Sequence, residues 1–323
     1  MNRILKGVRT FSAATMTRAV SEFRTPVPWG EVRGRDWGPK DGRPVLCIHG
    51  WADNAGTFNT LIPLLPQDWR FVAVDLPGHG LSSPRPPGVF YTFPSYVADV
   101  RRIVQALQWE RFTIIGHSMG ANVATVFSAL FPEMVEAVVL LDSYGSMPTE
   151  SKNLVKNLRN GVEEMIEYER NGNGKKEKIY TREKALERLM AANPVLTEHS
   201  AQNLLERGSI EVEGGLVFSR DFRINLTNIS RFSLEQSVAI FSQIQARVLI
   251  VLAENGLYKT YSIPEGYAEA LEKGFENTRQ FKEVTVSGDH HVHLNNPENV
   301  APVIIEFLQS VGPEEPGNAT AKL

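Results

Sequence analysis

The sequence is poor in the features that mark disulfide-stapled, membrane-spanning and nucleic-acid-binding proteins. Cys47 is the single cysteine among 323 residues, so no disulfide can form within the chain. No apolar stretch reaches the ~18 residues that a membrane-spanning helix needs. Lysine and arginine (34) nearly balance aspartate and glutamate (37), which leaves a formal net charge of −3 and no electrostatic footprint for nucleic acid. We therefore expect a globular chain without a membrane span, whose partner is a small, largely uncharged molecule.

The sequence does contain a series of short apolar runs rich in β-branched residues. Runs of this kind are typical of parallel strands that are covered on both sides. Segments with helical spacing separate them, at 95–107, 119–131 and 299–308. The pattern predicts an α/β domain with a mostly parallel sheet and helices on both faces. The expected strands are 45–48, 71–74, 113–115, 138–141, 248–252 and 284–286.

This alternation is interrupted between Asp142 and the strand that starts at Val248. The intervening stretch shows amphipathic helical patterns and one hairpin signal at 210–218. An insertion that leaves one strand and returns to the next lies over the carboxyl edge of the sheet, so we interpret it as a lid. The predicted organisation is a basic N-terminal extension (1–24), a core (25–142 and 245–311), a mainly helical lid (143–244) and a flexible tail (312–323).

The pentapeptide Gly116-His117-Ser118-Met119-Gly120 lies between an expected strand and an expected helix. A G-x-S-x-G motif in this setting predicts a nucleophile elbow, a sharp turn that exposes the serine hydroxyl at the end of a sheet. The two glycines are needed because side chains there would collide with the adjoining strand or helix. Ser118 is therefore the predicted nucleophile.

A serine hydroxyl becomes a good nucleophile only when a base takes its proton. Histidines in the glycine-rich turns and in the lid are poor candidates, which leaves Gly288-Asp289-His290-His291-Val292-His293 after the last strand. His290 is the predicted base because it begins that loop, and His291 and His293 are interpreted as wall or packing residues. A metal cluster of these histidines is disfavoured because no cysteine or further histidine lies at ligand spacing nearby. We expect neither a metal nor a cofactor.

The oxyanion formed after attack needs two backbone N–H donors. Met119, directly after the nucleophile, is expected to supply one of them. Trp51, in the His49-Gly50-Trp51 turn after the first core strand, is expected to supply the other.

The acid that orients His290 has two candidates, each at the end of a strand. Asp142 follows 138–141, and Glu254 follows 248–252. We favour Asp142 because its strand is expected beside that of Ser118, although capping the first turn of the lid would account for Asp142 equally well.

Taken together, these motifs resemble the α/β-hydrolase superfamily and, most closely, the serine hydrolase-like proteins of animals, from about Pro28 to Leu308. The order of serine, acid and histidine along the chain is also that of α/β-hydrolases. The resemblance implies a serine hydrolase, with peroxisomal members in the family. The chain departs from the superfamily at Gly256, where an acid is common. The resemblance rests on 49–54, 75–82, 116–120, 141–142, 219–221 and 288–293.

We predict a serine hydrolase that cleaves a carboxylic ester or thioester through an acyl-enzyme, with Ser118, His290 and Asp142 as catalytic residues. Two alternatives stay open. One is a catalytically weak or non-catalytic hydrolase shell that binds a ligand, which a missing acid would favour. The other is a carbon–carbon bond hydrolase, which would use the same three residues under a different lid.

Both ends of the chain resemble targeting signals. Residues 1–20 are basic and lack acidic residues, a composition typical of transit peptides, which makes the mitochondrion an alternative address. The last residues, Ala321-Lys322-Leu323, resemble the tripeptide that the peroxisomal import receptor recognises. We predict that the protein is peroxisomal and cytoplasmic, with that receptor as a partner.

Overall fold

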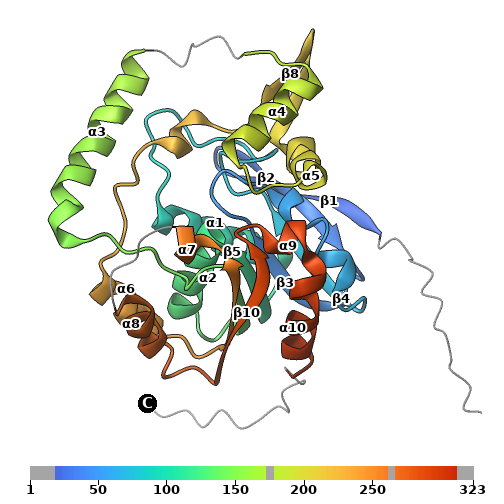
Figure 1. Cartoon of the computed structure of the whole chain (residues 1–323), viewed down its shortest axis with the longest axis vertical. Coiled ribbons are helices and arrows are strands. Elements are labelled where there is room, and N and C mark those ends of the chain that lie inside the picture. The colour runs from blue at the N-terminus through green and yellow to red at the C-terminus, as the bar shows by residue number, and fades with distance from the viewer. Residues whose placement is uncertain (1–18, 172–177, 261–265, 311–323) are drawn as a thin grey trace, which may run out of the picture.

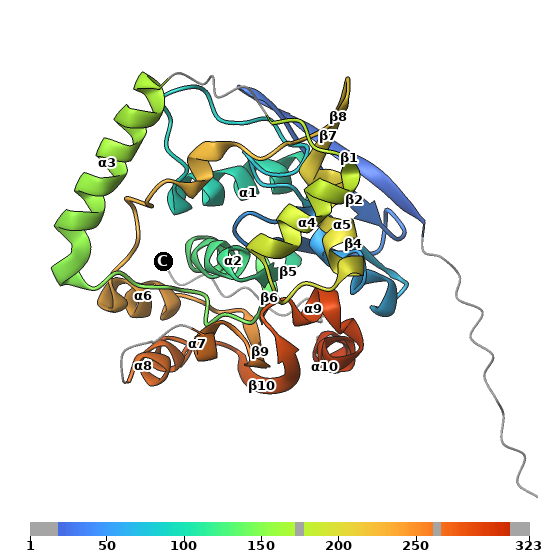
Figure 2. The same cartoon turned by 45° about the horizontal axis from the view of Figure 1, so that its top comes forward.

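The computed structural model describes residues 19–171, 178–260 and 266–310, and its centre is one eight-stranded sheet (Figures 1 and 2). The six strands β3, β4, β5, β6, β9 and β10 are parallel to one another. The strands β1 and β2 are antiparallel and lie at one edge. This arrangement confirms the predicted mostly parallel sheet. In spatial order the strands are β1 (Val20–Val27), β2 (Gly30–Trp37), β4 (Trp69–Val74), β3 (Arg43–Ile48), β5 (Phe112–His117), β6 (Val135–Leu141), β9 (Arg247–Asn255) and β10 (Gln280–Asp289).

The apolar strands are continuous runs because helices bury both faces of the sheet. In β3, Val45 and Cys47 belong to the core on one side, and Leu46 and Ile48 belong to the core on the other. The short helices α7 (Leu257–Thr260) and α9 (Val292–Asn295) follow β9 and β10. One face is covered by α1 (Phe93–Leu107), α2 (Met119–Leu130), α6 (Leu234–Phe241) and α8 (Tyr267–Gly274), and the other by α10 (Pro297–Ser310) with the 3₁₀ helices η1 (Ala55–Phe58) and η2 (Ile62–Leu64) (Figure 2).

The N-terminal hairpin β1–β2 was not among the expected strands. Residues 20–24, assigned from the sequence to a basic extension, are part of β1. Charged residues such as Glu22, Arg24 and Arg33 interrupt both strands, so no continuous apolar run marks them. They are strands because β2 pairs with β4, a contact that is distant in sequence. The basic residues 1–18, and the tail with Ala321-Lys322-Leu323, lie outside the described residues.

The insertion between β6 and β9 contains the helices and the hairpin that its sequence pattern predicts. Thr181, Thr197 and Ser233 cap α4, α5 and α6 through their side-chain oxygens. The insertion holds the 3₁₀ helices η3 (Ser151–Asn153) and η4 (Phe222–Asn225), the helices α3 (Leu154–Arg170), α4 (Arg182–Ala192), α5 (Glu198–Gly208) and α6, and the hairpin β7 (Ser209–Val212) and β8 (Gly215–Phe218).

The insertion lies over the loops that follow β3 and β4. Asn54 Nδ2 donates to Leu204 O at 2.8 Å, and the amide of Asp221 donates to Gly78 O at 2.9 Å. Because both loops leave the carboxyl ends of parallel strands, the insertion contacts the edge of the sheet at which the elbow lies.

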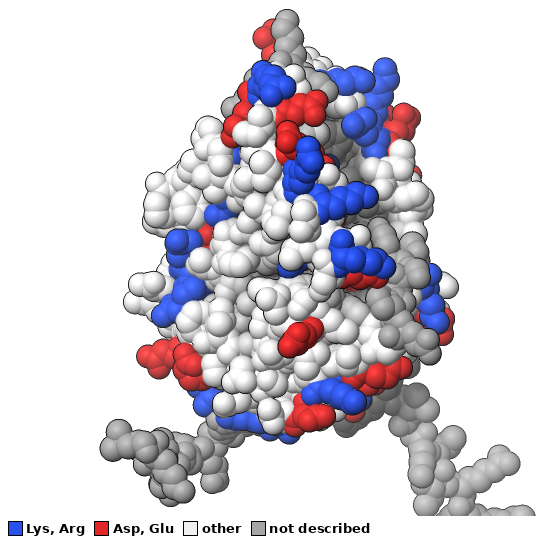
Figure 3. Space-filling model, turned by 90° about the vertical axis from the view of Figure 1, so that its left-hand side faces the viewer, with Lys and Arg blue, Asp and Glu red and all other residues white. Residues whose placement is uncertain are grey.

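Helix α3 lies at the border of the molecule in both views (Figures 1 and 2). Its apolar stripe is mostly exposed: Met165 is buried, but Leu158, Val162 and Ile166 are not. Figure 3, which looks onto this side, shows basic and acidic side chains interspersed, with no large field of one sign. Within the described ranges, no helix combines the length and the apolar character needed to cross a membrane.

Candidate active site

Ser118 occupies a strained turn between β5 and α2. Its backbone has φ 51° and ψ −113°, a region that residues with a side chain rarely adopt. A Cβ placed on Gly120 would lie 2.1 Å from the carbonyl oxygen of Ile48, and one on Gly116 would lie 2.5 Å from the carbonyl oxygen of Gly120. Only glycine fits at either position, so the G-x-S-x-G pattern has the steric origin that the elbow interpretation requires.

The two expected oxyanion donors lie on either side of this turn. Met119 is the first residue of α2, and the first N–H groups of a helix have no partner within it. A Cβ on Gly50 would lie only 3.3 Å from Ser118 Cβ, so the Gly50-Trp51 turn runs beside the serine. In the part of the chain that the structure describes, the backbone N–H of Trp51 forms no hydrogen bond. The Trp51 ring is held by its Nε1–H, which donates to Ile224 O of the insertion at 2.9 Å.

His49 holds the turn that carries Trp51. The amide of Leu76 donates to His49 Nε2 at 3.0 Å, so the proton of the neutral ring is on Nδ1, which contacts Gly50 O at 2.7 Å. Burial lowers the pKa of His49, outweighing the opposing hydrogen bond to Gly50 and the charge of Asp75. Protonation of Nε2 would also remove its hydrogen bond from Leu76.

This pKa shift predicts acid lability. Below about pH 6.5, His49 binds a proton in the unfolded chain, whereas the buried ring in the folded chain stays neutral. The free energy of unfolding therefore falls as the pH falls toward the folded-state pKa. The contribution is fully present above that pH. Urea unfolding between pH 7 and pH 4 should show a shallower pH dependence for His49→Gln than for the wild type. His199→Gln, which alters an exposed histidine, is the matched control and should keep the wild-type slope. Equal slopes for all three proteins would contradict this role of His49.

His290 and Asp142 form a short hydrogen bond, 2.6 Å between Nδ1 and Oδ2. Asp142 is 1% exposed, and its carboxylate also accepts from the amides of Ala253 (2.9 Å) and Leu257 (2.7 Å). Since the carboxylate oxygen can only accept, Nδ1 carries the proton and Nε2 is left as the basic nitrogen. The arrangement thus holds the His290 ring in one tautomer and one orientation.

The geometry also distinguishes Asp142 from Glu254 and accounts for Gly256. Glu254 is exposed and, among the described residues, forms no bond with His290. A Cβ on Gly256 would lie 2.1 Å from Asp142 Oδ1. The carboxylate of Asp142 therefore occupies the space that a side chain at position 256 would need. Where the family commonly carries an acid, this chain therefore has a glycine that makes room for the carboxylate of Asp142.

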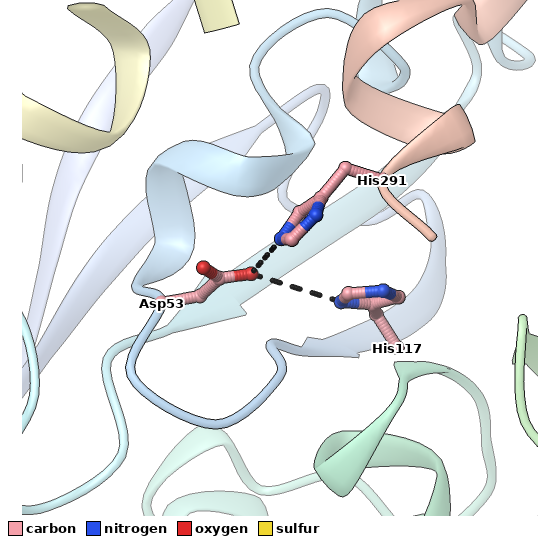
Figure 4. A group of neighbouring side chains, drawn as sticks. All are labelled: Asp53, His117 and His291. Carbon is pink, nitrogen blue, oxygen red and sulfur yellow. Dashed lines mark hydrogen bonds and ion pairs between the residues drawn. The ribbon is translucent and has the colours of Figure 1, made fainter. Parts of the chain in front are cut away.

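Asp53, His117 and His291 form a buried group (Figure 4). Asp53 Oδ2 is 3.3 Å from His291 Nε2 and 3.7 Å from His117 Nδ1. Burial opposes the ionisation of Asp53, but the charge and hydrogen bond of His291 outweigh it and lower the pKa of Asp53 to about 2. Burial likewise opposes charge on His291, yet Asp53 raises its pKa. For His117 burial dominates and holds the pKa well below the usual value.

Sequence spacing did not predict this group. The sequence offers no cysteine or further histidine at ligand spacing near 290–293, but the fold brings Asp53 from the loop after β3 and His117 from the end of β5 to His291. The carboxylate of Asp53 contacts His291. His291 and His293 are buried, consistent with their interpretation as wall residues.

One hydrogen bond links the serine turn to the histidine loop. His117, next to Ser118 in the chain, donates from Nε2 to the carbonyl oxygen of His290 at 2.8 Å. Within the described residues, no hydrogen bond joins Ser118 Oγ to His290 itself. Such bonds are often long in ligand-free hydrolases and shorten when substrate binds.

Comparison with known proteins agrees with this fold. The chain matches the alpha/beta hydrolase fold family over residues 43–297. A serine hydrolase-like protein of Danio rerio is 59% identical over 320 residues, 98% of each chain. A hypothetical protein of Pseudomonas aeruginosa PAO1 has a similar structure, with a TM-score of 0.79 and 31% identity over 89% of this chain and 99% of the other. The thioesterase domain from the curacin biosynthetic pathway has a TM-score of 0.74 and 25% identity, over 89% and 99%.

The match spans most of the chain, includes the elbow and extends to a relative of nearly equal length. The chain therefore belongs to the α/β-hydrolase family and, within it, to the serine hydrolase-like proteins.

Proposed function

We propose that the protein is a serine hydrolase that cleaves a carboxylic ester or thioester through an acyl-enzyme. The observation that carries this proposal is the 2.6 Å bond from His290 Nδ1 to the buried Asp142, in a loop that His117 links by a hydrogen bond to the strained elbow of Ser118. Such a histidine leaves Nε2 free to act as a base, and acyl transfer by a serine requires a base that takes the hydroxyl proton.

In the proposed mechanism, Ser118 Oγ attacks the substrate carbonyl while His290 Nε2 takes the hydroxyl proton. The carbonyl oxygen becomes an oxyanion, which accepts hydrogen bonds from the amides of Trp51 and Met119. The tetrahedral intermediate collapses, His290 gives its proton to the departing alcohol or thiol, and the acyl group stays on Ser118. Water then attacks the acyl-enzyme with His290 as base, and the free acid leaves. Asp142 stabilises the imidazolium in both halves of the reaction.

A hollow beside α2 is the proposed place for part of the substrate. Its lining combines apolar side chains, among them Val126, Phe232, Ile240 and Phe241, with Ser146, Arg231 and Ser237, and it includes none of Ser118, His290, Trp51 and Met119. Asn122, which also lines it, lies one helical turn after Ser118. Similarity to a thioesterase domain supports including thioesters among the substrates.

The alternatives are supported less well. The non-catalytic alternative would be favoured if no acid were available to His290. Asp142, however, lies within hydrogen-bond distance of His290. The carbon–carbon bond hydrolase requires the same three residues, so a direct comparison of substrates must decide between the two reactions.

A substrate panel tests the proposal. Purified protein is incubated with p-nitrophenyl esters of increasing acyl length, with acyl thioesters and with vinylogous diketones. We expect turnover of at least one ester or thioester and its loss in Ser118→Ala. Turnover of diketones alone would support the carbon–carbon bond hydrolase, and turnover that persists in Ser118→Ala would refute the proposed serine chemistry.

A further inference from the structure

We propose that Asp53, His117 and His291 form a binding site for a divalent transition-metal ion, with Zn²⁺ as the best fit. The three residues come from the loop after β3, the end of β5 and the loop after β10, and they are all buried. Figure 4 shows both imidazoles directed at the same oxygen of Asp53. The site is independent of the proposed hydrolase reaction.

The tautomer of His117 carries the argument. Its Nε2 contacts the carbonyl oxygen of His290 at 2.8 Å, and only an N–H can form that bond. In the neutral ring, Nδ1 is therefore an unprotonated acceptor. This nitrogen is buried and forms no hydrogen bond within the part of the chain that the structure describes.

The unpartnered nitrogen faces another acceptor. Asp53 Oδ2 lies 3.7 Å from His117 Nδ1, so a lone pair points at a carboxylate. Protonating Nδ1 does not close the gap, because 3.7 Å is too long for a hydrogen bond. A cation placed between the two atoms satisfies both of them, and His291 Nε2, 3.3 Å from the same oxygen, is positioned as a third ligand.

The donor atoms and their spacing suit zinc. Zn²⁺ binds imidazole nitrogen and carboxylate oxygen at about 2.0–2.2 Å, which sets tetrahedral ligand atoms roughly 3.4 Å apart. Here two of the separations are 3.3 and 3.7 Å, and all three ligand atoms lie within 4.8 Å of one another. Small side-chain rotations bring them to bonding distance.

The surroundings of His117 have two further features of a metal site. Histidines that bind metals commonly donate their other ring N–H to a carbonyl oxygen, as His117 does to His290. A Cβ on Gly50 would lie 2.8 Å from His117 Nδ1, so glycine at position 50 keeps the approach to that nitrogen open.

A bound ion would connect the two loops that present the nucleophile and the base. His117 precedes Ser118, and His291 follows His290. We therefore expect the metal to stabilise the fold at this point, as structural zinc sites do.

Metal binding to the full-length chain tests the site. The protein is stripped with a chelator, incubated with Zn²⁺ and desalted, and its zinc content and thermal unfolding are then measured. We expect the wild type to retain one zinc ion per chain and to unfold several degrees higher with zinc. Asp53→Asn and His291→Gln should lose both effects, whereas His199→Gln, altered at an exposed histidine, should behave as the wild type.

Two results would overturn the proposal: a wild type that retains no zinc, or Asp53→Asn and His291→Gln proteins that retain as much as the wild type. If these variants do not fold, Co²⁺ in the wild type provides the second test. Ligation by imidazole and carboxylate in a tetrahedral site gives visible absorption bands, and their absence would also overturn the site.

Discussion

Replacing Ser118 with alanine is expected to lower kcat by a factor on the order of 10⁶, the effect seen when the nucleophile of a serine hydrolase is removed. The substitution removes the attacking oxygen and leaves the elbow in place. Ser118 Oγ forms no hydrogen bond within the described residues, so the fold should tolerate its loss. Steady-state turnover of the best substrate, with thermal unfolding measured in parallel, checks both parts of the prediction.

A serine inside the helix that follows the elbow provides the control. Ser128 is buried in α2 and donates to Ala124 O at 2.7 Å, away from the elbow. Ser128→Ala removes a hydroxyl of equal size and should retain most of the activity. His290→Ala should be as severe as Ser118→Ala, and the double variant should be no worse than either, because nucleophile and base act as a unit. Near-normal turnover by Ser118→Ala would refute the assignment.

Replacing Asp142 with asparagine is expected to lower kcat about 10⁴-fold, the cost of placing the histidine in the wrong tautomer. An asparagine NH₂ directed at His290 Nδ1 donates to it and moves the ring proton to Nε2, where it blocks proton transfer from Ser118. In the flipped orientation the asparagine NH₂ would face the N–H of Ala253, and two donors cannot form a hydrogen bond with each other. Neither orientation therefore satisfies every hydrogen-bond partner. Thermal unfolding should accompany the kinetics, so that activity is expressed per folded molecule.

Glu254→Gln is the matched control for Asp142→Asn. It makes the same chemical change on an exposed carboxylate at the end of β9. We expect activity within a few-fold of the wild type. A large loss in Glu254→Gln together with normal activity in Asp142→Asn would show that the acid is supplied from β9.

Local patterns in the sequence predicted most of the core. Each central strand was a continuous apolar run, because both of its faces are buried, and the helices of the insertion showed helical spacing, which is also a local pattern. The strand β1 was not predicted, because charged residues interrupt its apolar residues and because it is stabilised by pairing with β2 at the edge of the sheet.

Features that depend on distant contacts could not be predicted in the same way. In the sequence, Gly256 is only a departure from the family pattern. The structure gives the reason for the glycine, because the carboxylate of Asp142 fills the space beside it. Asp53, His117 and His291 meet only because three loops converge at one edge of the sheet, so no spacing along the chain relates them. The apolar stripe of α3 was visible as a periodicity, but periodicity does not tell whether a stripe is buried.

The most direct test of the account is the site at which a fluorophosphonate probe attaches. Such a probe reacts only with an activated serine, and peptide mass spectrometry locates the adduct. We predict one adduct, on Ser118, formed rapidly by the wild type and far more slowly by Asp142→Asn and His290→Ala. Three results would contradict the proposal that Ser118, His290 and Asp142 act together. They are no adduct on the folded wild type, an adduct on another serine, or a labelling rate that is the same in Asp142→Asn as in the wild type.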